Sequence, residues 1–322
     1  MDTKDLESRL NKAWPEKSPL ATTADLANAG FGDRALATAL KHGLVYRLRR
    51  GAYVRALPWK RLKPWDREKL RLYAHVLTAP GEPVYSYFSA ARLQGLFIWN
   101  CSALVHVTMP APMTGASEAK DVQLHHDALT GEEVDHLTLR TGVRVKATTL
   151  ERTVVDCARV GGFAEAVIIG DHALRNGARL HVMWAMVGAL PGRRGVRRAR
   201  RVLSALNGLS ESPGESRTRL IIAGMKIDQP DLQKELIAGN RAYRPDFVWE
   251  KQKLIVELDG DIKYFAYKRM PEVILEERKR ERRLMEAGWR FVRLEWRDLA
   301  NPEEVRRRIM DAYAAPLMGM AA

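Results

Sequence analysis

YRPDFVWEKQKLIVELDGDIK, residues 243–263, carries the clearest structural pattern in this chain. Apolar side chains dominate two short runs, Tyr243–Trp249 and Leu254–Asp259, and the polar segment Glu250–Lys253 separates them. Runs of this length, rich in valine, isoleucine and aromatic residues and joined by a polar turn, are typical of a β-hairpin. We therefore expect two paired strands here, connected by a tight turn.

Three acids fall inside this predicted hairpin. Side chains alternate between the two faces of a strand, so Ile255, Glu257 and Asp259 share one face. A hairpin of this length also brings Asp246, on the first strand, alongside Glu257. An acid within an apolar strand has to be paired, solvated or bound to a cation, because an unpaired buried charge is costly.

Two interpretations of Asp246, Glu257 and Asp259 follow from this pattern. Clustered carboxylates are the hard oxygen ligands that suit Mg²⁺ or Mn²⁺, and these ions serve phosphodiester chemistry. Alternatively, each acid pairs with a surface arginine, which is easily supplied because the chain contains 53 lysines and arginines. The spacing alone favours neither interpretation.

The segments on either side of the hairpin predict helices. Downstream, EERKRERRLMEAG ends in Gly288, a residue typical of helix C-termini, and Arg290–Trp296 then alternates like a strand. Upstream, Ser212 opens a helix that runs to Gly224. Glu215 stands three residues after Ser212 and is expected to be its capping-box partner, a position that still permits a metal-binding role.

The order of these motifs resembles a known family. PDF, ELDG with Lys263 three residues on, the charged helix and the VRLEW strand together look like the small domain related to very-short-patch-repair endonucleases. That domain belongs to the restriction-endonuclease-like PD-(D/E)xK nucleases, and the resemblance covers roughly Ser212–Arg308. It implies that Asp246 and Glu257 are metal ligands and that Glu215 is an additional acid.

The chain departs from the PD-(D/E)xK pattern at one position. Asp259 stands where the pattern has its lysine. Related domains often carry a histidine at the place of Lys263, so Lys263 either supplies the missing cation or lies beside the DNA backbone. The expected catalytic set is Asp246, Glu257, Asp259, Lys263 and Glu215, with Mg²⁺ or Mn²⁺ held by Asp246, Glu257 and Asp259. In this set Asp259 either holds a second ion or orients the attacking water, and Lys263 stabilises charge on the phosphorane.

The chain as a whole is long and basic. Its 322 residues suffice for two or three domains, each with a core of its own. A formal net charge of +14 indicates a nucleic-acid partner, although a basic surface also serves solubility or an acidic protein partner. The sequence has no apolar run long enough to predict a membrane span. Its first residues have no apolar segment that would predict a secretory signal. Cys101 and Cys157 lack metal-site spacing and favour a cytoplasmic location.

The first 58 residues predict a winged helix-turn-helix. Two short helices are expected, one with Thr23 as its N-cap and one from Asp33 to His42, and the basic segment LVYRLRRGAYV then forms a hairpin about Arg50-Gly51. In a winged helix the second helix enters the major groove and the hairpin touches the backbone. The candidate phosphate contacts are Lys41, Arg47, Arg49 and Arg50, and a solvated hairpin is the alternative.

This region resembles the N-terminal winged helix of AbiEi-type antitoxins from abortive-infection systems. The similarity continues through YSYFSAARLQGL, the strand VHVTMP and the segment VKATTLERTVVDCARVGGFAEAVIIGDHALRNG, and so covers roughly residues 5–180. It implies DNA binding and a scaffold role, and it raises a toxin as a protein partner.

Basic residues recur in the second half of the chain. A break at Pro191–Gly195 precedes a predicted helix over Val196–Leu206, on which Arg197 and Arg198 are candidate DNA contacts. Arg280, on the charged helix after the hairpin, is a further candidate. A solvated charged face is the alternative for each.

Together these patterns predict an α+β multidomain protein. Its expected parts are a winged helix at residues 1–58, a mixed α/β scaffold domain at 59–190, a basic linker helix at 191–211 and an α/β restriction-endonuclease-like domain at 212–322. The favoured function is metal-dependent hydrolysis of DNA phosphodiesters. The alternative is a non-catalytic DNA-binding regulator, antitoxin-like, that retains a nuclease fold.

Overall fold

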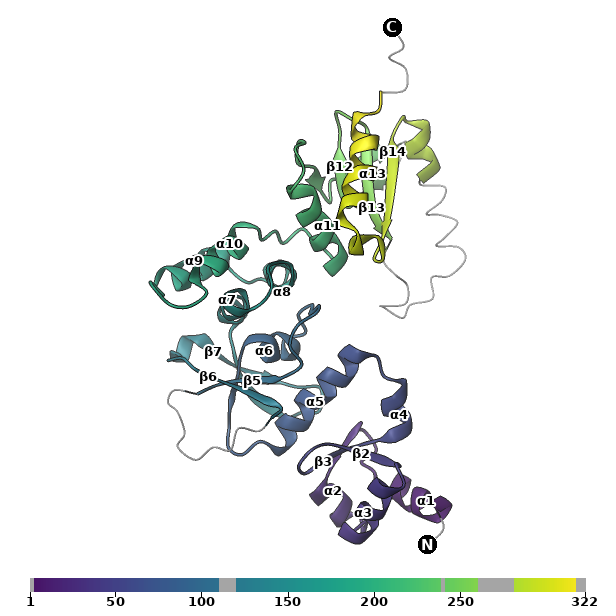
Figure 1. Cartoon of the computed structure of the whole chain (residues 1–322), viewed down its shortest axis with the longest axis vertical. Coiled ribbons are helices and arrows are strands. Elements are labelled where there is room, and N and C mark those ends of the chain that lie inside the picture. The colour runs from purple at the N-terminus through teal and green to yellow at the C-terminus, as the bar shows by residue number, and fades with distance from the viewer. Residues whose placement is uncertain (1–2, 110–119, 239–240, 260–280, 317–322) are drawn as a thin grey trace. The chain divides into compact units, whose positions relative to one another are not determined.

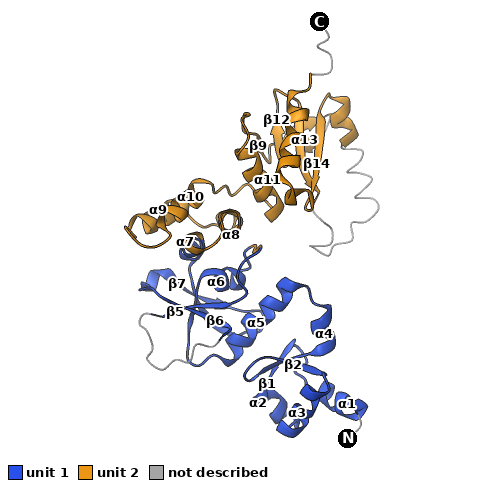
Figure 2. Ribbon diagram, in the orientation of Figure 1, with its two compact units in different colours: residues 1–96, 100–157 blue, residues 97–99, 158–322 orange. Residues whose placement is uncertain are grey.

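The computed structural model describes residues 3–109, 120–238, 241–259 and 281–316 (Figure 1). The chain has a mixed α+β architecture with several small sheets, as predicted. It divides into two compact units, residues 1–96 with 100–157 and residues 97–99 with 158–322 (Figure 2). The predicted domain limits stay predictions.

The first unit begins with three helices and a small antiparallel sheet. The elements are α1 (Thr3–Ala13), β1 (Leu20–Thr22), α2 (Thr23–Asn28), α3 (Asp33–Lys41), β2 (Val45–Arg49) and β3 (Ala52–Arg55), with strand order β1–β3–β2. Leu6, Leu26 and Leu36, one from each helix, pack in its core. Gly51 turns the β2–β3 hairpin at φ +84°, a conformation that favours glycine.

One predicted helix start in this module is wrong by one residue. Thr22, and not Thr23, is the N-cap of α2: its hydroxyl accepts a hydrogen bond from the Asp25 amide, and the Asp25 carboxylate accepts one from the Thr22 amide. The reason is that a capping box needs an acid three residues after the cap, and Asp25 has that spacing only from Thr22.

The rest of the first unit is a five-stranded mixed sheet with helices. The elements are α4 (Ala56–Arg61), α5 (Pro64–Thr78), β4 (Val84–Tyr85), α6 (Tyr87–Leu93), β5 (Val105–Met109), β6 (Val122–His126), the 3₁₀ turn η1 (Gly131–Glu133), β7 (Val134–Thr138), β8 (Arg144–Thr148) and most of α7 (Leu150–Val160). The strand order is β6–β5–β4–β8–β7. Buried Arg152 of α7 pairs with Asp127, Glu133 and Asp156, which compensates its charge.

The second unit joins a helical part to a four-stranded sheet. Its helical part comprises α8 (Phe163–Arg175), α9 (Leu180–Gly188) and α10 (Val196–Ser204). It continues with α11 (Pro213–Ala223), β9 (Asp231–Leu232), β10 (Leu236–Ala238), β11 (Arg241–Tyr243), β12 (Phe247–Trp249), β13 (Leu254–Asp259), β14 (Arg290–Glu295), η2 (Asp298–Ala300) and α13 (Pro302–Ala314). Strand order is β14–β13–β12–β9, with β13 and β14 parallel and β12 antiparallel to β13.

Side chains of β13 divide between two cores, as their alternation predicts. Leu254 and Val256 pack against Ile222 of α11 and Ile309 of α13, and these two helices lie on one side of the sheet (Figure 1). Ile255 packs on the other side in a smaller cluster. The face that carries Ile255 also carries Glu257 and Asp259, because successive residues of a strand alternate.

The first strand of the predicted hairpin is shorter than expected. Tyr243–Trp249 is divided into β11 and β12, and the three residues between them are outside any strand. Pro245 lies at the break, and proline has no backbone N–H to donate to a ladder. The residues before the break pair with β10 in a separate two-stranded sheet, so a single strand is replaced by two.

Candidate functional site

The structure places Asp246 beside the end of the second hairpin strand. Phe247 pairs with Val256 in the β12–β13 register, so Asp246 and Glu257 are the next two positions along the ladder. The Asp246 Oδ2 atom accepts a hydrogen bond of 2.9 Å from the Leu258 amide. The predicted proximity of Asp246 to the Glu257 strand position is therefore confirmed.

Gln233 connects Asp246 to Glu215, a contact that the sequence patterns did not indicate. Its side-chain amide nitrogen donates to Glu215 Oε2 at 3.0 Å and to Asp246 Oδ1 at 3.1 Å. Gln233 adopts φ +52°, which is uncommon for a residue with a side chain. Strained conformations of this kind concentrate at functional sites, and Gln233 is accordingly part of the candidate site.

Glu215 has a structural role as well as a place beside Asp246. Its amide donates to the Ser212 hydroxyl at 3.1 Å, which caps α11, while its carboxylate accepts from the Glu211 amide at 2.7 Å. Only one half of the predicted capping box with Ser212 is thus present in these contacts. The carboxylate is instead directed toward Gln233 and the acid beyond it.

Burial strongly perturbs this pair of acids. Burial, together with the charge of Asp246, raises the pKa of Glu215 to about 7. Burial also raises the pKa of Asp246, against hydrogen bonds from Leu258 and Gln233 that lower it. Two buried acids with raised pKa values are typical of a functional site, although structural networks produce the same effect.

Glu257 and Asp259 form ion pairs, which is the alternative that the sequence left open. Arg293 of β14 stands beside Glu257 in the parallel register, and its guanidinium lies 3.7 Å from Glu257 and 3.6 Å from Asp259. It also bonds Glu281 at 2.8 Å. Within the residues that the structure describes, no group of three or more acidic, histidine or cysteine side chains is arranged to hold a metal ion. Lys263 and Arg280 lie outside these residues.

A second candidate site is the exposed side of α3 with the β2–β3 hairpin. Arg34, Thr38 and Lys41 recur at spacings of four and three residues, so they share one helix face. Leu36 and Ala39 on the opposite side are buried and hold the helix on the core. Lys41 is a predicted contact and Arg34 is not, although the position of Arg34 seven residues before Lys41 on a helix indicates that the two share a face.

The predicted arginines of the hairpin do not all point the same way. Arg47 and Arg50 are exposed. The Arg49 side chain is only 17% exposed, and its guanidinium lies 3.6 Å from Asp121. Arg49 therefore holds the hairpin within the first unit and does not stand with the exposed cations.

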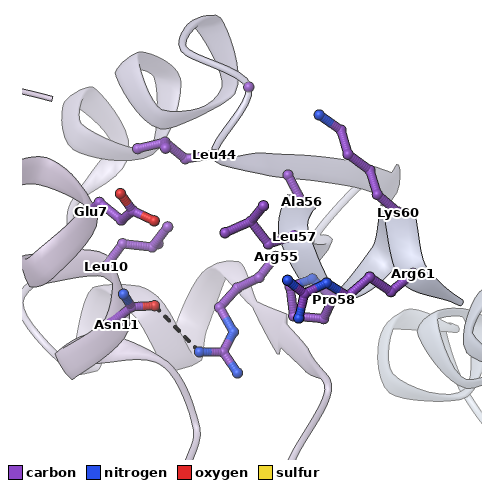
Figure 3. A pocket seen from close by; sticks show the side chains of 11 residues that line it. Glu7, Leu10, Asn11, Leu44, Arg55, Ala56, Leu57, Pro58, Lys60 and Arg61 are labelled. Atoms are coloured by element: carbon purple, nitrogen blue, oxygen red, sulfur yellow. Dashed lines mark hydrogen bonds between the residues drawn. The ribbon is translucent and has the colours of Figure 1, made fainter. Parts of the chain in front are cut away.

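A hollow of about 620 Å³ lies in the same unit beside α4 (Figure 3). Leu57 points into it, and Arg55 on its wall donates to Asn11 at 3.3 Å and lies over the Trp14 ring. Its lining mixes apolar side chains with the cations Arg55, Lys60 and Arg61. None of the predicted site residues lines this hollow.

The predicted contacts Arg197 and Arg198 lie on α10 in the second unit, far along the chain from α3. Both side chains are exposed. Together with Arg201 they line a hollow of about 570 Å³ at the Gly161–Gly162 turn. The two basic surfaces thus belong to different units.

Comparisons with known proteins bear mainly on the N-terminal module. A family model described as "Transcriptional regulator, AbiEi antitoxin" matches residues 15–56, which confirms the predicted AbiEi likeness of this part. The match spans β1 through β3 and includes the exposed face of α3. The likeness of the C-terminal part to very-short-patch-repair endonucleases stays a prediction.

Two curated relatives are each named as an uncharacterized protein. Rv2248 and MT2308, from two strains of Mycobacterium tuberculosis, are each 32% identical over 162 residues, which is 48% of this chain and 58% of the relative. The chain thus spans 58% of the length of these curated relatives. The crystal structure of the RV2827C protein from Mycobacterium tuberculosis matches with a TM-score of 0.41 at 15% identity, over 74% of this chain and 90% of that one.

No helix among the described residues combines the length and the apolar character that crossing a bilayer requires.

Proposed function

We propose that this protein is a DNA-binding transcriptional regulator of the AbiEi antitoxin kind, which contacts duplex DNA through α3 and the β2–β3 hairpin. The observation that carries the proposal is the match of residues 15–56 to that family over the very segment that presents Arg34, Lys41, Arg47 and Arg50 to solvent. An antitoxin acts with a toxin, so a protein partner of that class belongs to the proposal.

The module has the parts that a winged helix uses. Two helices, α2 and α3, precede a short hairpin, and the apolar side of α3 is fixed on the core. The major groove admits an α-helix, and N-terminal residues of the second helix contact base edges, so Arg34 and Thr38 are in position to read bases. Arg47 and Arg50 on the hairpin are in position for phosphates.

Removing the two exposed hairpin arginines is expected to weaken DNA binding at every sequence. Each lost phosphate contact removes about 0.9 from the slope of log K against log salt, so Arg47→Ala with Arg50→Ala should flatten the slope by about 1.8. Fluorescence anisotropy of a labelled duplex over a salt series measures it. Arg49 is left in place because its charge is paired with Asp121.

The matched control removes two exposed cations elsewhere, Arg140→Ala with Lys251→Ala. This variant loses the same net charge, so its slope should stay close to that of the parent if the hairpin makes local contacts. Equal slopes for the hairpin variant, the control and the parent would mean that the hairpin is a solvated surface without DNA contacts.

A second function, phosphodiester hydrolysis, is favoured by one observation, and we propose it as the lesser candidate. Glu215 and Asp246 are buried, share the Gln233 amide and have raised pKa values. Mg²⁺ is commonly held by one or two carboxylates together with substrate phosphates and water. The two carboxylates of Glu215 and Asp246 are therefore enough to hold such an ion when a phosphate is bound. When bound, such an ion would polarise a phosphoryl oxygen and activate a water.

The remaining predicted ligands fit this function less well. Arg293 pairs with Glu257 and Asp259, so both of these acids already have a cationic partner, while the charge of Asp259 still contributes to the raised pKa of Asp246. In this function Gln233 would orient the carboxylates of Glu215 and Asp246. Arg293 would supply positive charge on the face of the sheet that carries Glu257. The regulator is therefore the better supported function.

The second function predicts a metal response that one variant removes. The parent is expected to nick supercoiled plasmid in Mg²⁺ or Mn²⁺ but not in EDTA, and to gain about 2.7 kcal/mol of stability at a metal concentration a hundredfold above Kd. Asp246→Asn should abolish both effects and leave gel retardation of the plasmid intact. Asp311→Asn, in an exposed ion pair with Arg307, is the control.

An absence of nicking on duplex, single-stranded and mismatched DNA, with no melting shift in either metal, would remove this second function. DNA retardation in the same samples would still support the function of a DNA-binding regulator.

A further inference from the structure

The helix α10 presents a dense row of arginines. Six arginines fall within nine residues and all are exposed, namely Arg193, Arg194, Arg197, Arg198, Arg200 and Arg201. The apolar side of the helix is buried through Val196, Ala199, Val202 and Leu203. Arg197, Arg198 and Arg201 recur at spacings of three and four residues within α10, so they line one side of the helix, and Arg194 lies in the turn before it.

These arginines differ in their pairing from other exposed arginines of the second unit. Among the residues that the structure describes, no acidic side chain forms an ion pair with any of the six. Three exposed arginines elsewhere in this unit do have such partners: Arg282 bonds Glu286, Arg297 bonds Glu295 and Arg307 bonds Glu304. Among the described residues, then, no carboxylate compensates the positive charge of this segment.

The backbone under this row is held in place. Gly195 starts α10 at φ +86°, and a Cβ there would lie 2.3 Å from the Arg159 carbonyl oxygen, so the helix start packs closely on the end of α7. Arg198 donates to the Arg159 and Val160 carbonyls at 3.3 and 3.1 Å. A fixed helix presents its cations at a constant spacing, which favours a regular anionic ligand.

Next to this row, the turn at Gly161–Gly162 leaves the hollow of about 570 Å³. The Arg201 guanidinium lies over the Phe163 ring at 4.4 Å, which orients it on the wall of the hollow. Helix α8 begins at this turn after its cap residue Gly162, and the Glu165 carboxylate lies against that residue, since a Cβ on Gly162 would stand 2.2 Å from Glu165 Oε2. The three arginines that line the hollow outnumber this one acid, so the hollow carries a net positive charge from side chains.

The kind of polyanion follows from the helix itself. A basic amphipathic helix binds an anionic membrane through its apolar face, but in α10 that face is buried in the unit. Arginine forks match phosphate geometry, and Arg197 and Arg201 stand about 6 Å apart along the helix axis, which corresponds to roughly two phosphates of one DNA strand.

We propose that α10 and the Gly161–Gly162 turn form a second DNA-backbone surface, in the unit that does not contain the AbiEi-like module. The proposal deepens the proposed function and rests on it for the choice of duplex DNA as ligand. It assigns the protein two separate sets of phosphate contacts, which add to one another in affinity when both engage DNA.

The test uses the full chain with Arg194→Gln, Arg197→Gln and Arg201→Gln, in salt titrations on a labelled duplex of mixed sequence. Loss of three phosphate contacts should flatten the log K against log salt slope by about 2.7, so that between 50 and 200 mM salt the parent loses about 40-fold more affinity than the variant. Unchanged melting temperature confirms that the variant folds.

The control triple variant has Arg282→Gln, Arg297→Gln and Arg307→Gln, which removes the same charge from arginines that are already paired. Its slope should stay near that of the parent. A slope equal for the α10 variant and this control overturns the proposal. So does a loss of binding that is confined to polyglutamate, which would indicate an acidic protein ligand.

Comparison with the Arg47→Ala, Arg50→Ala variant separates the two proposals. If the hairpin variant binds DNA like the parent and the α10 variant does not, the AbiEi-like module fails as the DNA contact while the α10 surface stands. If instead the hairpin variant loses DNA binding and the α10 variant does not, the AbiEi-like module is the DNA contact and the α10 proposal is overturned. Additive slope changes in the combined variant support both.

Discussion

Asp171→Ala is expected to lower the free energy of unfolding by about 3–5 kcal/mol, because it leaves a largely buried arginine without its partner. Asp171 is 1% exposed on α8 and accepts hydrogen bonds of 2.7 Å from Arg219, the Ser216 hydroxyl and the Asn207 amide. These bonds connect α8 to α11, the helix that carries Glu215. Chemical denaturation of the parent and the variant measures the difference.

Two comparisons identify the cause of that loss. Asp311→Ala breaks an exposed pair with Arg307 and should cost no more than about 1 kcal/mol. Asp171→Ala combined with Arg219→Ala should cost less than the sum of the two single changes, because the double variant has no unpaired charge. Additive losses would mean that Asp171 stabilises the fold by packing and not through Arg219.

Glu215→Gln is expected to stabilise the protein at pH 8 by about 3 kcal/mol and to leave its stability nearly unchanged at pH 4.5. Burial and the charge of Asp246 raise the pKa of Glu215 from 4.5 to about 7. Between these values the folded state keeps a proton that the unfolded state has lost, so the stability of the parent falls as pH rises and the loss is complete above pH 7. Glutamine carries no such penalty.

The measurement is the free energy of unfolding of both proteins from pH 4.5 to 8. Glu286→Gln, in an exposed pair with Arg282, is the control and should run parallel to the parent. A difference between the parent and Glu215→Gln that does not change with pH would show that Glu215 is ionised throughout. Added Mg²⁺ at pH 8 should reduce the difference only if a cation binds between Glu215 and Asp246.

The acids and the basic surfaces point to different activities, and the variants separate them. Asp246→Asn changes metal response and hydrolysis without touching a DNA-contact arginine. The hairpin and α10 variants change phosphate contacts and leave the acids in place. A protein that binds DNA through both basic surfaces and shows no metal response is a regulator whose C-terminal sheet has a structural role.

Local patterns of the sequence predicted the elements whose form depends on near neighbours. The strand Leu254–Asp259 has its predicted limits, and the helix after Ser212 ends at Gly224 as expected. Alternation, capping and positive-φ glycine are properties of a few consecutive residues, so they are visible before the chain folds. The exposed side of α3 follows from the same helical spacing, and the charge of α10 from composition.

Partners of the charged side chains could not be predicted in this way. Gln233 bridges Glu215 and Asp246 across intervals of 18 and 13 residues, and Arg293 takes Glu257 and Asp259 from the neighbouring strand. Arg49 is directed to Asp121 although its neighbours Arg47 and Arg50 are exposed. A chain with 53 lysines and arginines and 39 acids allows many ion pairs, and the neighbouring sequence does not distinguish between them. Strand register and helix packing select among them, because they set which side chains come within a few ångströms of each other.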